Sequence, residues 1–386
     1  MKTFFRNILT RNTHRTLGLD GLRYDKFYVN NLASQAIKVT KIPKPKGGFR
    51  NIYIYCLRDR IEAQNIFDFI ELNHLDKFIY PKVFGVKNKP VFVAQQRITK
   101  WYKRVFKNKV TNKYFLKGDV KNFYDCMNKK ICLDLIQKLQ IFDSSQLAFI
   151  YSVIYKDVLE NGKWMCYTKG LHTGLTLVNL FSNLYLKELD SGLDMLSKTY
   201  LRVGDDFFAT FDSLDDLEMA KVYMQSCMQK LDLEYTYCFG DACALEFDFL
   251  GYVYVEGRVL IRKSSLARVK RNISGRFKPV SGSLEYKKNL LIQKYSGDNG
   301  FDVYINSVLD AYRFMNCNKQ AYYINDYLLR YLNNFLFGYK GDQNYAELKQ
   351  LLKDLNIDTF YDKFWKLQSG RLKYSQLRKS PFRHVK

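Results

Sequence analysis

Two adjacent carboxylates interrupt an otherwise apolar stretch at residues 200–211, which read YLRVGDDFFATF. The residues on either side predict two short β-strands, joined by a turn at Gly204 and Asp205. Two like charges at the end of a buried hairpin repel one another unless a positive charge lies close to both. Because hard oxygen ligands suit Mg²⁺, the stretch predicts a hairpin whose turn binds a divalent cation.

A solvated turn is the competing interpretation of two adjacent aspartates, and a third carboxylate weighs against it. Asp119 follows an apolar stretch in KYFLKGDVKNFYD, residues 113–125, which predicts a strand ending near this residue. Phosphoryl transfer by two cations about 4 Å apart requires carboxylates from more than one strand. We therefore expect Asp119 to converge with Asp205 and Asp206 around metal ions.

The charge of the chain indicates a polyanionic partner. The 386 residues include 62 Lys and Arg against 38 Asp and Glu, a formal net charge of +24. An excess of this size favours nucleic acid over an acidic small molecule, with solubility as the simpler explanation. The hydrophobic fraction of 47% and the length allow two or three domains with sizeable cores.

Cysteine spacing and hydropathy bear on the compartment. None of the eight cysteines forms a C-x-x-C pair, which disfavours a zinc site and favours a reducing cytoplasm. We find no signal peptide and no apolar run long enough to span a bilayer, so no membrane partner is expected. An amphipathic presequence in the first residues stays open.

The remaining patterns predict a mixed α+β chain. They comprise a basic loop or hairpin at 38–50, a helix at 57–72, a helix at 128–140, a largely apolar helix at 174–190, an amphipathic helix at 212–233 with Ser213 as its N-cap, a hairpin at 247–262 turning at Glu256 and Gly257, and a mostly helical region from 264 onward.

Six blocks, taken in order, resemble the reverse transcriptase family. They read KPKGGFRNI, LRDRIEAQNIF, GDVKNFYD, GLHTGLTLVNLFSNLYLKELD, RVGDDF and FLGY. The similarity is to the bacterial branch of group II intron, retron, diversity-generating and defence-associated enzymes. It implies a right-hand polymerase with fingers at 1–112, a palm with an antiparallel sheet at 113–256, and a thumb with a helical C-terminal region at 257–386. Part of 126–170 would then belong to the fingers.

The resemblance assigns roles at the catalytic centre. Asp119, Asp205 and Asp206 would be the catalytic metal ligands, assisted by the carbonyl of Val120, with Mg²⁺ or alternatively Mn²⁺ as the ion. Nucleotide binding would fall to Lys46, Arg50, Tyr124 and Gly174. Tyr124 stands where relatives hold a bulky aromatic that excludes the ribose 2′-hydroxyl. A solvated hairpin is the alternative for Lys46 and Arg50, and an ordinary aromatic residue is the alternative for Tyr124.

Binding of primer and template is implied for two further segments. The residues concerned are Phe249, Leu250, Gly251, Tyr252, Arg262, Lys263, Arg268, Lys270 and Arg271.

Departures from the common motifs keep RNA synthesis open. Val203 replaces the usual Tyr, and the resulting Gly-Asp-Asp is also the signature of viral RNA-dependent RNA polymerases. Those enzymes carry Ser-Gly-x-x-x-Thr in the next block, whereas here Thr173 precedes Gly174 and Val178 replaces the Thr. They also lack an aromatic residue at the place of Tyr124.

Other departures indicate which kinds of bacterial reverse transcriptase the chain resembles most. His172 and Thr173 replace Pro-Gln, and residues 231–240 lack the Lys that many relatives carry. The motifs of an intron endonuclease and the retron Val-Thr-Gly block are absent from the sequence. Diversity-generating and defence-associated enzymes remain, and the divergent blocks favour defence.

The expected function is RNA-templated DNA synthesis from dNTPs, copying a dedicated non-coding RNA in antiphage defence. The alternatives are diversity-generating, untemplated or protein-primed DNA synthesis, RNA synthesis, and a non-catalytic RNA-binding scaffold. Three retained carboxylates argue against a scaffold, which has no reason to keep charge repulsion in a cleft. The charge is compatible with an oligomer that assembles on RNA.

Overall fold

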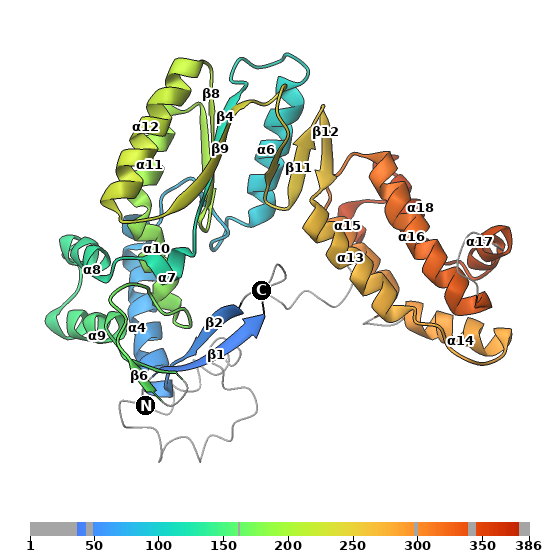
Figure 1. Cartoon of the computed structure of the whole chain (residues 1–386), viewed down its shortest axis with the longest axis horizontal. Helices are drawn as coiled ribbons and strands as arrows, with labels where there is room; N and C mark the ends of the chain where they lie inside the picture. Colours follow the sequence, from blue (N-terminus) through green and yellow to red (C-terminus); the bar gives the residue numbers. More distant parts are fainter. Residues whose placement is uncertain (1–36, 44–48, 161–162, 297–299, 339–344, 378–386) are drawn as a thin grey trace. The chain divides into compact units, whose positions relative to one another are not determined.

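The computed structural model describes residues 37–43, 49–160, 163–296, 300–338 and 345–377. This part of the chain contains both helices and strands up to Ile261 and only helices beyond it (Figure 1), which confirms the predicted α+β class. The chain divides into two compact units. The first comprises Met1–Pro90 and Tyr114–Phe239, and the second comprises Val91–Lys113 and Gly240–Lys386. The boundaries expected for fingers, palm and thumb stay predictions.

A five-stranded sheet forms the centre of the first unit, in the order β3-β7-β8-β4-β9. Its strands are β3 Val83–Phe84, β7 Thr199–Val203, β8 Asp206–Phe211, β4 Tyr114–Val120 and β9 Tyr235–Asp241. β8 pairs antiparallel with both β7 and β4, whereas β3 runs parallel to β7. The predicted hairpin at 199–211 and the predicted strand ending near Asp119 are both confirmed.

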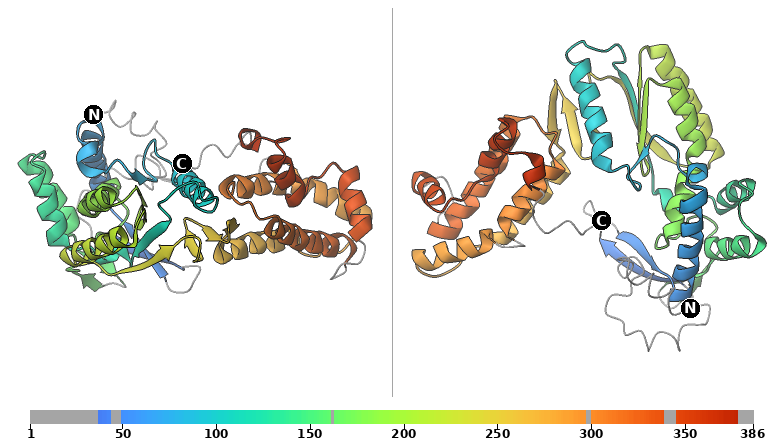
Figure 2. Two further views of the ribbon diagram at one scale, coloured as in Figure 1. Left: turned by 90° about the horizontal axis from the view of Figure 1, so that it is seen from above. Right: turned by 180° about the vertical axis from the view of Figure 1, so that it is seen from behind.

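Helices α11 (Lys187–Leu196) and α12 (Leu214–Lys230) lie side by side on one face of this sheet (Figure 1, Figure 2). Alternate residues of β8 face them: Phe207, Ala209 and Phe211 belong to the same buried apolar core as the α12 residues Met224 and Met228. Since side chains alternate along a strand, Asp206 and Phe208 project from the opposite face. The predicted cap is confirmed, because the Ser213 hydroxyl accepts from the Asp216 N–H at 3.1 Å.

The single helix predicted at 174–190 is wrong in extent. The structure has α10 Thr176–Tyr185 and then α11, with a break at Leu186, where φ is −95° and ψ is 4°. Leu186 is completely buried, and neither Gly nor Pro marks the position. Apolar periodicity continues across the break, so the pattern of side chains does not reveal it.

A four-stranded sheet, in the order β2-β1-β5-β6, completes the first unit with five helices. β1 and β2 form the hairpin predicted over 38–50, and the helix predicted at 57–72 is also confirmed. β1 pairs in parallel with β5, a contact between distant segments that no local pattern indicates. The elements are β1 Ile37–Pro43, β2 Phe49–Ile54, β5 Val158–Glu160, β6 Lys163–Met165, α4 Leu57–Asn73, α5 Leu75–Phe78, α7 Phe123–Cys126, α8 Lys129–Lys138 and α9 Ser144–Ile154.

The second unit combines α6 (Val91–Val105) with a three-stranded meander and a helical region. The meander corrects the single hairpin predicted at 247–262, because a first turn at Leu250–Gly251 precedes the expected turn at Glu256–Gly257. All four turn residues have positive φ, as two-residue hairpin turns of type I′ require. The strands are β10 Phe247–Phe249, β11 Tyr252–Val255 and β12 Arg258–Ile261.

The region beyond residue 264 is mostly helical, as predicted. α16 is its central helix, contacting α13, α14, α17 and α18 through buried leucines such as Leu328 and Leu332. The helices are α13 Lys263–Arg276, α14 Leu284–Tyr295, α15 Phe301–Ala311, α16 Asn318–Phe337, α17 Tyr345–Asp354, α18 Phe360–Gln368 and α19 Tyr374–Leu377. Among the residues that the structure describes, no helix has both the length and the apolar character needed to cross a membrane.

Candidate active site

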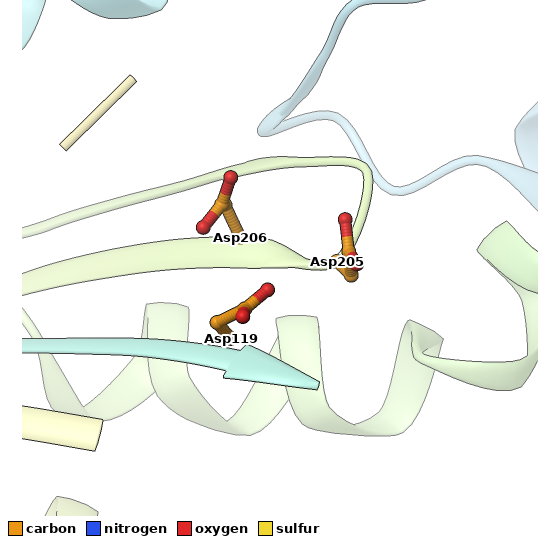
Figure 3. A group of neighbouring side chains, drawn as sticks. All are labelled: Asp119, Asp205 and Asp206. Carbon is orange, nitrogen blue, oxygen red and sulfur yellow. The ribbon is translucent and has the colours of Figure 1, made fainter. Parts of the chain in front are cut away.

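Three carboxylates meet at one end of the five-stranded sheet. Asp119 lies near the end of β4, and Asp205 and Asp206 lie where β7 turns into β8 (Figure 3). One carboxylate oxygen from each residue lies within 4.8 Å of the others. Asp119 is exposed and the other two are half-buried, so the group is open to solvent. The structure thus brings the three predicted acids together, and their catalytic role stays a prediction.

Strand register explains this convergence. Asp119 of β4 stands directly opposite Asp206 of β8 in the antiparallel ladder, where facing residues have their Cβ atoms about 5 Å apart. Asp205 is the second residue of the two-residue turn, and Gly204 before it has a φ of +64°. Asp205 is not among the residues with a positive φ, and a positive φ at the first central residue alone is the pattern of a type II′ turn, which favours glycine there.

The donor set suits a hard divalent cation. Carboxylate oxygens are the ligands that Mg²⁺ and Mn²⁺ prefer, and three negative charges at this separation repel without a cation between them. Such an ion would be held by Asp119, Asp205 and Asp206. Val120, whose carbonyl was expected to help, is the last residue of β4 and has a buried side chain.

A buried ion pair lies directly behind the turn, and the sequence analysis missed it. Arg202 of β7 and Asp190 of α11 are 1% and 0% exposed, and the Arg202 guanidinium binds the carboxylate through two nitrogens at 2.7 Å each. Burial acts to lower the pKa of Arg202, but the facing carboxylate raises it above the usual value. A single Arg within an apolar strand and a single Asp closing an apolar helix were the available signals.

Tyr124 connects two of the predicted blocks. Its hydroxyl donates to Asn179 Oδ1 of α10 at 3.1 Å, and its carbonyl accepts from the Leu171 N–H at 2.7 Å. The side chain is half-buried and packs on the edge of the core. Both ends of this residue are therefore fixed by the segment that also contains Gly174.

The loop containing Gly174 is docked against β2. A Cβ atom on Gly174 would lie 2.4 Å from the Tyr53 carbonyl oxygen, and its φ of +134° also excludes most other residues. His172 stacks on the Tyr53 ring with 4.5 Å between centroids, and its carbonyl accepts from the Tyr55 hydroxyl at 3.0 Å. Arg50 lies in the same strand as Tyr53, opposite Ile42, whereas Lys46 lies outside the described residues.

His172 should make the stability of the chain dependent on pH. Burial, with Lys129 nearby, lowers its pKa to about 4, and within the described residues its buried Nε2 has no hydrogen-bond partner. Because the unfolded chain binds this proton more readily, stability should fall as pH drops from 7 towards 4. We expect a loss of about 2 kcal/mol between pH 7 and pH 5. Urea unfolding at both values should show this loss in the wild type and much less of it in His172→Gln; an equal loss in both would contradict the assignment.

The residues predicted to bind primer and template all lie in the second unit. Phe249, Leu250, Gly251 and Tyr252 form the first turn of the meander and its flanking strand residues. The structure does not bring this group and the three acids into one unit.

The basic residues of this set lie in α13 or, for Arg262, immediately before it. Lys270 lies over the Tyr327 ring, 4.4 Å from its centroid, and donates to the Tyr323 hydroxyl at 2.9 Å. Arg268 donates to the Tyr312 hydroxyl at 3.1 Å. Arg262, just before the helix, lies 3.3 Å from Asp248, and Lys263 and Arg271 complete the basic set.

Comparison with known proteins yields distant structural likenesses. No family model and no curated protein matches the sequence. Apo telomerase from Candida tropicalis, truncated from its C-terminal domain, is 19% identical at a TM-score of 0.46, covering 59% of this chain and 55% of its own. Candida albicans telomerase, solved with a fragment of telomeric RNA, is 13% identical at 0.44, covering 89% and 64%. The RNA-dependent RNA polymerase of a human picobirnavirus is 14% identical at 0.43, covering 87% and 65%.

The chain thus spans less than two thirds of each of these three proteins. With identities below 20% and TM-scores below 0.5, the likenesses assign neither a family nor an activity to this chain.

Proposed function

We propose that this protein is a template-directed nucleic-acid polymerase that adds nucleotides to a primer 3′ end. The observation that carries the proposal is the convergence of Asp119, Asp205 and Asp206 at the end of an antiparallel pair. Carboxylates from two strands in this arrangement are what two-metal phosphoryl transfer requires. Solvent access to the acids is compatible with a polymeric substrate.

In such a polymerase, different residues of the chain would bind the metal ions, the incoming nucleotide, and the primer and template. The three aspartates would hold Mg²⁺ ions, and such ions would supply Lewis-acid stabilisation of the charge that develops during phosphoryl transfer. Arg50 and Lys46 bind the triphosphate of the incoming nucleotide, and Gly174 lets the backbone approach the new base pair. The basic residues of α13 contact the phosphate backbone of primer and template through charge, independently of sequence.

We further propose that the template is RNA and the product is DNA. Support comes from Tyr124, which the sequence resemblance matches to the aromatic residue that excludes the ribose 2′-hydroxyl in reverse transcriptases, and whose hydroxyl and carbonyl are hydrogen-bonded to Asn179 and Leu171. RNA synthesis is the second candidate, and the Gly204-Asp205-Asp206 turn favours it. The +24 charge supports a nucleic-acid partner of either kind.

The biological setting is proposed from the sequence blocks and the cysteines. Divergence of the Pro-Gln and Tyr-x-Asp-Asp blocks supports the defence-associated branch, in which the template would be a dedicated non-coding RNA. Eight free thiols support a reducing compartment such as the cytoplasm. The divisions 1–112, 113–256 and 257–386 are proposed as fingers, palm and thumb.

Incorporation assays with the purified full chain test this function. The protein is given a DNA-primed RNA template with labelled dNTPs or labelled NTPs, and its co-purified RNA is assayed and sequenced in parallel. Labelled DNA supports the first proposal, and labelled RNA supports the second. If neither labelled DNA nor labelled RNA forms on either template, under Mg²⁺ or under Mn²⁺, only a non-catalytic RNA-binding role would remain.

A further inference from the structure

We propose that Arg202 and Asp190 are positioning residues that hold the turn carrying Asp205 and Asp206 in the shape that binds metal. The inference rests on the proposed function, because it concerns the same three carboxylates. Neither residue belongs to the predicted metal ligands. Both lie on the helix-covered side of the sheet and act on the acids through the backbone of the turn.

The Arg202 guanidinium donates to three acceptor oxygens at once. Its Nε and Nη2 donate to the two oxygens of Asp190 at 2.7 Å each, and its Nη1 donates to the Gly204 carbonyl at 2.6 Å. Asp190 accepts a further hydrogen bond from the Tyr200 hydroxyl at 2.6 Å. One planar guanidinium therefore joins helix α11 to the residue immediately before Asp205.

This link acts on the backbone and not on the substrate. Arg202 pairs across the hairpin with Phe207, whose side chain is in the helix-side core, while Asp206 projects from the other face. The guanidinium consequently reaches the site only through the Gly204 carbonyl. Gly204 itself gives no steric support, since a Cβ atom there would meet nothing within 4 Å.

Repulsion between the acids explains why the turn needs such a link. Three carboxylates within 4.8 Å of one another push the hairpin turn away from β4 whenever no cation lies between them. A type II′ turn with a glycine is easily deformed, because glycine has access to many backbone conformations. Holding the Gly204 carbonyl opposes that deformation and preserves the ligand positions before an ion binds.

A buried ion pair can instead serve folding alone, so the test must separate the two roles. In the triple variant Asp190→Leu, Tyr200→Phe, Arg202→Met, apolar side chains of similar size replace every buried polar group of the network, a change that often leaves stability intact. Arg202→Lys keeps the positive charge, but one ammonium cannot form the fork and reach Gly204. Tyr200→Phe alone removes one contact of Asp190 and leaves the Gly204 link, and serves as the matched control.

Metal binding is measured directly, by electron paramagnetic resonance titration of Mn²⁺ into the full chain without nucleotide. Hydrogen exchange of the backbone amides around residues 203–206 is measured in the same variants. Groups that orient metal ligands typically contribute about 10–100-fold to affinity. We expect the Mn²⁺ dissociation constant to rise by about that factor in the triple variant and in Arg202→Lys, with faster exchange at the turn and an unchanged constant in Tyr200→Phe.

Several outcomes would overturn the inference. One is a folded triple variant, judged by circular dichroism, that binds Mn²⁺ like the wild type. Another is loss of the fold in the triple variant and in Arg202→Lys alike, which would assign the pair to stability. The inference also fails if the wild type binds no Mn²⁺, or if the Mn²⁺ that it binds is still bound by Asp205→Asn. If that Mn²⁺ binds and responds to the variants but no nucleotide is incorporated, the proposed function fails while the positioning role stands.

Discussion

Asp205→Asn is expected to lower nucleotide incorporation on the order of a thousandfold or more, because removing one carboxylate from a set of three weakens the hold on both metal ions. Asn keeps the shape of the side chain and the turn, so the fold should be retained. The amide removes one of three mutually repelling charges, so stability without metal should be equal or slightly higher. Steady-state incorporation assays and circular dichroism measure the two quantities on the same preparation.

Asp119→Asn should behave in the same way, because this residue faces Asp206 across the ladder. Asp215→Asn is the matched control: this exposed residue lies in the first turn of α12, outside the cluster, and the change should leave activity within about twofold and cost no more than roughly 1 kcal/mol of stability. Activity of Asp119→Asn or Asp205→Asn close to that of the wild type would remove the catalytic assignment. An Asp215→Asn loss as large as theirs would show that the assay reports folding.

The second large effect concerns the choice of sugar at Tyr124. Tyr124→Ala should admit ribonucleotides, raising their kcat/KM relative to the matching deoxynucleotides by about a hundredfold, since the ring no longer excludes the 2′-hydroxyl. The measurement is single-nucleotide incorporation with each dNTP and NTP pair on one template. Incorporation of the dNTP should fall much less. Asn179 loses its hydrogen-bond partner in this variant, but it is exposed and can bond to water instead.

Tyr124→Phe separates the ring from the hydroxyl. It retains the bulk that the gate requires and loses only the hydrogen bond to Asn179, so sugar selectivity should stay within a few fold of the wild type. Unchanged selectivity in Tyr124→Ala would defeat the gate hypothesis. A wild type that already prefers NTPs would favour the RNA polymerase candidate.

Elements with strong local signals were predictable. The hairpin around Gly204, the strand before Asp119 and the helix capped by Ser213 were each recognised from a turn residue, an apolar run or a capping residue within a few positions. The break at Leu186 escaped recognition, because a buried leucine continues the apolar pattern on both sides. The first turn of the meander was likewise missed, although Leu250-Gly251 joins two strands just as Glu256-Gly257 does.

Contacts between distant segments were beyond local patterns. The parallel pairing of β1 with β5 joins strands separated by several helices, and nothing in either strand specifies its partner. The stacking of His172 on Tyr53 arises in the same way, from a loop and a strand that only folding brings together. These two contacts are therefore recognisable only in the folded structure.

The amino-acid sequence alone indicated which kinds of residue the candidate active site would contain. These are three acids at the ends of apolar strands, a glycine at a turn and an excess of basic residues. These follow from side-chain chemistry and from neighbours within a few positions. Only the tertiary structure decided that Asp119 faces Asp206, and that Arg202 closes on Asp190 behind the turn. Both depend on strand register and helix packing, where many weak and distant apolar contacts add up to one arrangement.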